Sequence, residues 1–172
     1  GYHRETTVFP GDLSDTKGTS GLKLNHLWPN QKFHVEFSAN YMEDKNRLIN
    51  MDLTSLALNT PPNAPSMYKA DGSINWQPSS TGISSFIDNP ARYLDLKFQN
   101  KSTNLLSNLV TSYNIAPGLT LKSSFGYNKL QSSEHRITPL SSIPPEYATR
   151  ISMIDDANKY IESWIAEPQI NY

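Results

Sequence analysis

The sequence contains no cysteine. This excludes a disulfide framework, a thiolate metal site and a cysteine nucleophile. The chain also has no large excess of positive or negative charge. Its 15 Lys and Arg residues nearly balance its 16 Asp and Glu residues, and the net charge is −1. No basic patch is visible in the sequence, so nothing points to nucleic acid as a partner.

Apolar residues are few, at 37% of the 172 residues, whereas globular domains have about 45–50% on a similar count. No run approaches the roughly 18 apolar residues of a membrane helix. A membrane barrel needs no such run, since its strands are about 9–11 residues long and only half of their positions are apolar.

The main positive evidence for strands is the alternation of apolar and polar residues along the sequence. Residues 32–41, KFHVEFSANY, place Phe33, Val35, Phe37, Ala39 and Tyr41 on one side of a strand and polar residues on the other. The dry face of such a strand touches either the core of a soluble sheet protein or lipid. In the lipid case the wet face lines a water-filled interior.

Compact turn signals separate further alternating stretches. Residues 21–28 and 32–41 flank Pro29-Asn30, and residues 104–115 and 119–128 flank Ala116-Pro117-Gly118, which predicts two antiparallel hairpins. Residues 2–9 and 160–172 are strand candidates at the two ends. We expect several side chains of these strands to form one continuous exposed apolar surface: Phe33, Val35, Phe37, Leu121, Phe125 and Tyr127.

The connections between the predicted strands differ greatly in length. Long irregular segments are expected from Asn46 to Ser102 and from Gln131 to Asp156, and both fall at the end of the sheet opposite the two short turns. Membrane barrels show this inequality, with short periplasmic turns and long external loops. Aromatic residues eight positions apart, Phe33 and Tyr41, are about 20 Å apart along the normal of a tilted strand, close to the gap between two aromatic girdles. A helical stripe (Tyr147, Ile151, Ile154, Ile161 and Ile165) offers a competing interpretation of the last segment.

The order of several short stretches resembles the SusC/RagA family of TonB-linked outer-membrane transporters of Bacteroidetes. The stretches are GYHRETTVFPGD, NQKFHVEFSANY, ALNTPPNAP followed by YKADGSINW, DNP, YNIAPGLTLKSSFGYN and SWIAEPQINY. The resemblance runs through essentially the whole chain, and it favours a strand for residues 163–172.

The resemblance implies an all-β fold. Residues 1–172 would form an antiparallel meander of about six strands, an incomplete segment of a large transmembrane β-barrel domain of the TonB-dependent receptor type. It also implies an outer-membrane location, a SusD-like surface lipoprotein as a lid, and import of an oligosaccharide or peptide driven by the TonB complex. Both ends of the chain suggest an internal fragment without its plug domain.

No motif for chemistry is present, so we expect neither an enzyme nor a metal or other cofactor. The pairs His3/Glu5 and His34/Glu36 share strand faces and are interpreted as ordinary polar-face residues. The ligand-binding candidates in the long loop are Tyr68, Asn75 and Trp76, because aromatic faces stack on sugar rings and amides bind hydroxyls. Alternatively, Trp76 anchors the loop to the barrel rim.

Two other protein classes compete with the transporter. A soluble β-sandwich carbohydrate-binding module would need its apolar faces to meet each other. A glycoside hydrolase fragment would need a carboxylate pair across a cleft, and Glu162 and Glu167 fall on opposite faces of a strand.

Overall fold

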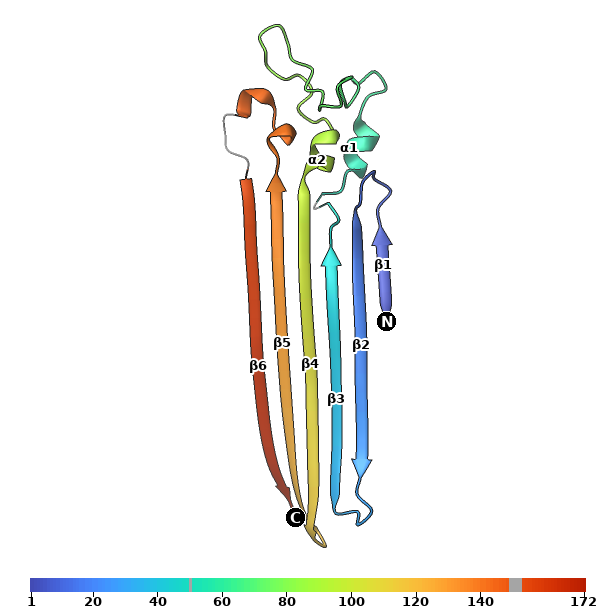
Figure 1. The fold of residues 1–172 in the computed structure, drawn as a ribbon, viewed down its shortest axis with the longest axis vertical. Helices are drawn as coiled ribbons and strands as arrows, with labels where there is room; N and C mark the ends of the chain where they lie inside the picture. Colours follow the sequence, from blue (N-terminus) through green and yellow to red (C-terminus); the bar gives the residue numbers. More distant parts are fainter. Residues whose placement is uncertain (50, 149–152) are drawn as a thin grey trace.

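The chain forms one long antiparallel sheet (Figure 1). The computed structural model describes residues 1–49, 51–148 and 153–172. Six strands follow one another across the sheet in chain order. They are β1 (Tyr2–Thr6), β2 (Ser14–Leu27), β3 (Phe33–Asn46), β4 (Lys97–Ala116), β5 (Leu119–Thr138) and β6 (Met153–Asn171). The prediction of an all-β antiparallel meander of about six strands is confirmed. The sheet is open, and its place in a larger barrel stays a prediction.

Two short turns close one end of the sheet, which we call the turn end. Residues 28–32 join β2 to β3, and the backbone N–H of Trp28 donates to the carbonyl of Phe33 at 3.0 Å. Pro117-Gly118 joins β4 to β5, and Gly118 has a φ of 80°, which Gly adopts without steric cost. Both predicted hairpins are confirmed.

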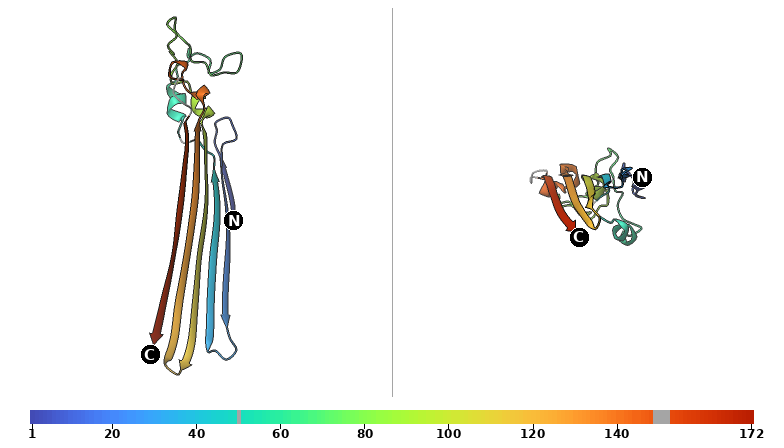
Figure 2. Two further views of the ribbon diagram at one scale, coloured as in Figure 1. Left: turned by 60° about the vertical axis from the view of Figure 1, so that its left-hand side comes forward. Right: turned by 90° about the horizontal axis from the view of Figure 1, so that it is seen from below.

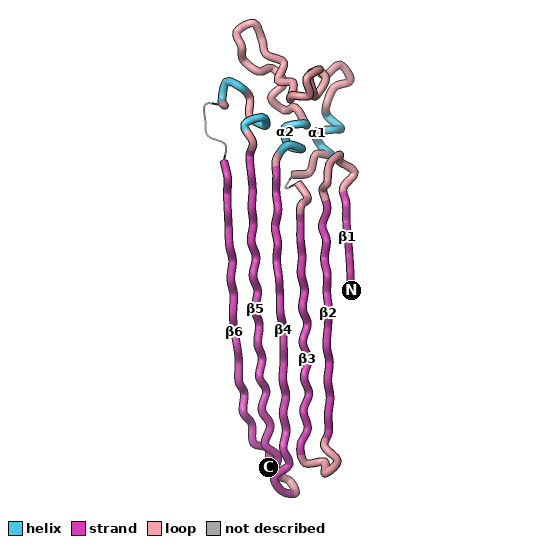
Figure 3. Tube along the Cα trace, in the orientation of Figure 1, coloured by secondary structure: helices cyan, strands magenta, loops and turns pink. Residues whose placement is uncertain are grey.

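The opposite end, which we call the loop end, carries every long connection, as Figure 3 shows by colour. Residues 47–96 join β3 to β4 and contain the short helices α1 (Thr54–Asn59) and α2 (Ala91–Asp95). The β5–β6 connection contains the 3-10 turns η1 (Leu140–Ser142) and η2 (Pro145–Tyr147). The prediction that the long segments share one end is confirmed.

The strands are longer than predicted at the loop end. The irregular segments were expected to end at Ser102 and to run from Gln131 to Asp156, yet residues 97–102, 131–138 and 153–156 are strand. Those boundaries were wrong because alternation marks a strand only where one face is apolar. Toward the loop end both faces are polar, as in the β5 stretch QSSEHRIT.

The helical interpretation of the last segment is wrong for residues 153–171, which pair with β5 along their whole length. Of the stripe, Tyr147 lies in η2, and Ile151 lies outside the described residues. The strand that the family resemblance favoured for residues 163–172 is confirmed as far as Asn171.

The described residues form a single-layered sheet, and the turned views in Figure 2 show no second sheet formed by them. Among the described residues, the buried apolar side chains are Leu53, Ile74, Trp76 and Ala91, and all four lie in the β3–β4 connection. The apolar side chains of the strands therefore have no cover within this part of the chain. In the described residues, the apolar faces do not meet each other as the sandwich alternative requires.

Candidate functional site

The strand register sorts side chains onto two faces. Leu24, Phe37, Leu109, Phe125 and Ala166 lie directly opposite one another across β2 to β6. We call such a set a row, and we call the side of the sheet that carries it the apolar face. Because side chains alternate along a strand, the neighbouring residues belong to the opposite side, the polar face.

Four consecutive rows of the apolar face contain no Asp, Glu, Lys or Arg. We call them the apolar band. Its members are Leu22, Leu24, His26, Phe33, Val35, Phe37, Ala39, Ser107, Leu109, Thr111, Tyr113, Leu121, Ser123, Phe125, Tyr127, Trp164, Ala166, Pro168 and Ile170. The six residues expected to form one apolar surface all belong to the band, so their shared face is confirmed. Leu121 and Phe125 are exposed, and the other four are half-buried.

The polar face at the same level carries charges. Lys23, Glu36, Lys122 and Glu167 alternate in sequence with residues of the apolar band. His34 lies 3.5 Å from Glu36 and makes a 2.9 Å hydrogen bond with Asn25. Charge therefore lies on one face only over this part of the sheet. A sheet with water on both sides has no need for that asymmetry.

Aromatic side chains border the band on both sides. At the turn end, ring centroids of Trp28 and Phe33 are 4.8 Å apart, and those of Phe33 and Tyr113 are 6.4 Å apart. Toward the loop end, the hydroxyls of Tyr127 and Tyr160 both donate to the Glu162 carboxylate. The two borders are about eight residues apart along a strand, or roughly 26 Å.

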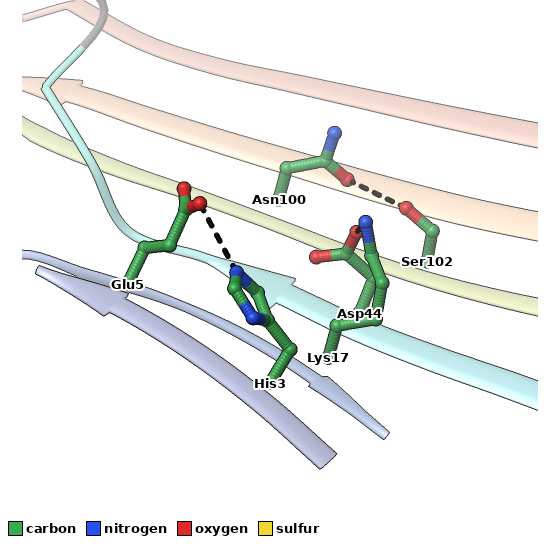
Figure 4. Close-up of polar contacts among 6 residues, drawn as sticks. All are labelled: His3, Glu5, Lys17, Asp44, Asn100 and Ser102. Atoms are coloured by element: carbon green, nitrogen blue, oxygen red, sulfur yellow. Dashed lines mark hydrogen bonds and ion pairs between the residues drawn. The ribbon is translucent and has the colours of Figure 1, made fainter. Parts of the chain in front are cut away.

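Beyond the band, both faces are polar. Figure 4 shows His3, Glu5, Lys17, Asp44, Asn100 and Ser102 on the polar face there. His3 lies 3.1 Å from Glu5, and Lys17 lies 3.2 Å from Asp44. On the apolar face, Glu43 pairs with Lys101 at 3.1 Å. Over the described residues, no group of three His, Cys, Asp or Glu side chains could hold a metal ion.

The β3–β4 connection folds into a small unit with its own core. Trp76 is only 5% exposed and packs with Ile74 and Ala91. Asn89 is fully buried, and its amide donates to the carbonyls of Met67 and Asn75 at 2.8 and 2.9 Å. The side-chain oxygen Oδ1 of Asn89 accepts from the backbone N–H of Ala91 at 2.9 Å. This one side chain therefore ties three stretches of the loop together.

The β5–β6 connection is fastened to that unit. The backbone N–H and hydroxyl of Ser84 donate to the two carboxylate oxygens of Glu146 at 3.0 and 2.8 Å. The hydroxyl of Ser141 donates to Asp95. Partial burial alone raises the pKa of Glu146, but hydrogen bonds from its own backbone N–H and from Ser84 outweigh this, and the net pKa is lowered.

A hollow of about 320 Å³ opens where three connections meet. It is lined by Pro10 and Gly11 before β2, by Tyr68, Gly72, Ser73, Ile74, Ala91, Leu94 and Asp95 of the β3–β4 connection, and by Ser141. It offers one aromatic ring, a carboxylate and hydroxyls. That set of groups suits a polyhydroxylated ligand or a peptide backbone.

The three predicted ligand-binding residues have different environments. Tyr68 is 44% exposed and lines the hollow. Asn75 uses both ends of its amide inside the loop, donating to the Ser66 carbonyl at 2.9 Å and accepting from the Gln77 N–H at 3.1 Å. Trp76 has no open ring face for stacking on a sugar, and its packing partners Ile74 and Ala91 belong to the loop itself, so its role as an anchor to the barrel rim stays a prediction. Sequence reasoning missed Asp95 and Ser141, because only the fold brings them beside Tyr68.

In comparisons with known proteins, no family model, no curated protein and no solved structure matches this chain. Among the described residues, no helix is both long enough and apolar enough to cross a membrane.

Proposed function

We propose that this chain is a segment of a TonB-dependent outer-membrane transporter that imports oligosaccharides or peptides together with a SusD-like surface lipoprotein. The observation that carries the proposal is the charge asymmetry of the sheet. The apolar band has no charge where the polar face has Lys23, Glu36, Lys122 and Glu167. Lipid on one side and a water-filled lumen on the other account for that asymmetry.

Strand length supports the same interpretation. β4 and β5 have 20 residues each, or roughly 66 Å, while the two aromatic borders of the apolar band are only roughly 26 Å apart. A barrel wall that extends beyond the membrane on the loop side would have polar residues on both faces there. The sheet has this composition beyond the band.

Ligand contact is assigned to the loop end. The hollow beside Tyr68 offers an aromatic ring with Asp95 and Ser141 around it. We interpret it as one contact site for the transported ligand, outside the cell. No bond chemistry is needed for import, and the residues assigned here hold and release a ligand.

The rival soluble carbohydrate-binding module would use the same hollow but would leave the apolar band in water. Exposed apolar patches on soluble monomers rarely exceed a few hundred Å². Leu24 and Trp164 of the band are 50% and 78% exposed. A second sheet would have to cover them, and the described residues form one sheet only.

The topology is tested by labelling single cysteines in whole cells, using the complete protein in which this chain occurs. Because the chain has no cysteine of its own, Ser80→Cys reports on the β3–β4 connection and Lys32→Cys on the turn end. A membrane-impermeant maleimide should label Ser80→Cys and leave Lys32→Cys unlabelled until the cells are lysed. Equal labelling of both positions in intact cells would refute the proposed orientation.

The transport role is tested by removing residues 61–89 from the complete protein. Barrel assembly should survive, since no residue of the apolar band is touched. Ligand uptake or capture of the lipoprotein should fall. If both persist at the original level, the connection is a spacer, and the assigned role of the loop is wrong.

A further inference from the structure

Three cations lie in one row of the apolar face, three rows beyond the last row of the apolar band on the loop side. Arg4 of β1 lies opposite Thr16, Thr16 opposite Lys45, and Lys45 opposite Lys101. All three cationic side chains are exposed. The row continues through Ser133 and Asn158 and contains no carboxylate. In the sequence these three residues are far apart, and only the register brings them together.

Such a row is unfavourable by itself. Like charges directly opposite each other on neighbouring strands destabilise a sheet, and Lys45 and Lys101 are such a pair. Glu43, one row closer to the band, neutralises Lys101 at 3.1 Å. Within the described residues, Arg4 and Lys45 form no ion pair. The row therefore lacks at least one counter-charge that the sheet itself does not supply.

The position of the row indicates where that counter-charge comes from. The row lies four residues beyond Tyr41, at the border of the band, or about 13 Å along the strand and about 10 Å along the normal of a tilted strand. Lipid headgroups occupy roughly the first 5–7 Å outside the hydrocarbon. The long stems of Lys and Arg let their charged ends reach back toward that level.

We propose that Arg4, Lys45 and Lys101 bind the phosphate groups of a lipid in the membrane leaflet next to the loop end. The proposal rests on the proposed function, since it takes the apolar band to face lipid. Neighbouring strands are about 4.8 Å apart, so the cations span three strand spacings, wide enough for more than one phosphate. Arg supplies a fork of donors that matches phosphate oxygens, and the two Lys residues supply point charges.

The test compares two triple variants of the complete protein. Arg4→Gln, Lys45→Gln and Lys101→Gln remove the row. Lys23→Gln, Lys122→Gln and Lys159→Gln remove the same charge from the polar face and serve as the matched control, since none of these three lysines is in an ion pair within the described part of the chain. The probe is diphosphorylated lipid A in mixed detergent micelles, beside the same lipid with its phosphates removed. Bound lipid is measured by native mass spectrometry.

The original protein should prefer the phosphorylated lipid. Each cation near an anionic headgroup contributes roughly fivefold in affinity, so loss of the row should weaken binding between about 30-fold and about 150-fold. The control triple variant should bind within about threefold of the original protein. Equal losses in both triple variants, or no preference for the phosphorylated lipid, would overturn the proposal. Displacement of the lipid by inorganic phosphate at equal concentration would assign the row to a soluble anion and would also overturn it.

Membrane fractionation and heat-modifiable electrophoretic migration separate this result from the proposed function. If the protein is absent from the outer membrane, both proposals fail together. If it assembles there and binds lipid A equally well with and without the lipid's phosphates, only the lipid site fails. Should the triple variant not assemble, the single variant Lys45→Gln should still lose roughly fivefold in affinity.

Discussion

Ser84 and Glu146 are separated by 62 residues in the sequence and are joined by two hydrogen bonds. They fasten the β5–β6 connection to the β3–β4 connection above an otherwise open sheet. Together with the bond from Ser141 to Asp95, they hold the connections that line the hollow. The geometry of the candidate ligand site therefore depends on contacts between segments that are far apart in the chain.

Replacing Glu146 with Gln should loosen the two connections from each other. The amide has one acceptor oxygen where the carboxylate has two, and its NH₂ group faces the donors of Ser84. We expect faster amide hydrogen exchange in residues 78–86 and 140–147, with unchanged exchange in β4 and β5. Glu43→Gln, on the strands, is the matched control. Unchanged exchange in both loop segments would show that the contact is not needed.

Acid should have the same effect as that substitution. The pKa of Glu146 is lowered in the folded chain, so its stabilisation is fully present above its ordinary pKa of 4.5. It is lost as the pH falls through the lowered value. Protection factors in the two loop segments, which correct for the pH dependence of intrinsic exchange, should fall below pH 4.5 in the original protein and stay flat in the Gln variant. Parallel pH profiles would refute this assignment.

Asn89→Ala should unfold the loop unit without disturbing the sheet. The substitution leaves the Asn75 carbonyl without a donor and the buried N–H of Ala91 without its acceptor, while the Met67 carbonyl keeps only the bond from the Asn75 N–H. We expect a cost on the order of 2–3 kcal/mol. Limited proteolysis should then cut within residues 61–90. Asn63→Ala, at an exposed position of the same connection, should leave the cleavage pattern unchanged. A protease-resistant Asn89→Ala variant would contradict the role assigned to this side chain.

A segment could be predicted from the sequence where its structure depends on local residue patterns, and could not be predicted where it depends on tertiary contacts. Both hairpins were predictable because residues such as Phe33 to Tyr41 alternate beside turn residues with strong conformational preferences. The outer parts of β4 and β5 were not, because a strand with two polar faces has no periodic signal. Tyr68 could be picked out by its chemistry alone. Asp95 and Ser141 could not be picked out, since only tertiary contacts place them at the hollow beside Tyr68.

Charge substitutions on the two faces should separate lipid from water. Phe37 lies midway between the two borders of the apolar band, and Ser38 is the next residue, on the polar face. Phe37→Lys in the complete protein should cost about 2–4 kcal/mol from the charge alone near a bilayer midplane. Ser38→Lys places a cation opposite Lys23 and should cost no more than about 1 kcal/mol. The fraction of assembled protein in the outer membrane measures the difference, and equal assembly of the two variants would favour a face that is not in lipid.

The isolated 172-residue chain should not form a stable monomer in water. The band stays uncovered, and the free edge of β6, whose residues are all exposed, offers unpaired backbone groups to other chains. We expect aggregation on removal of denaturant and no cooperative thermal transition, measured by analytical ultracentrifugation and circular dichroism. A soluble monomer with a sharp transition would contradict the membrane assignment.

Paired substitutions in the loop should distinguish ligand contact from support. Tyr68 lines the hollow with an exposed ring, whereas Trp76 fills the loop core. Tyr68→Ala should weaken ligand binding and leave the loop folded, because little apolar area is lost from the core. Trp76→Ala should cost about 3–5 kcal/mol of local stability by opening a cavity, and it should reduce binding only through loop unfolding. Ligand affinity by calorimetry and loop protection by hydrogen exchange are measured on the same samples. If Tyr68→Ala binds as the original protein does while its loop stays protected, the hollow is not the ligand site. If Trp76→Ala loses affinity with its loop fully protected, Trp76 contacts the ligand directly and the anchoring interpretation is wrong.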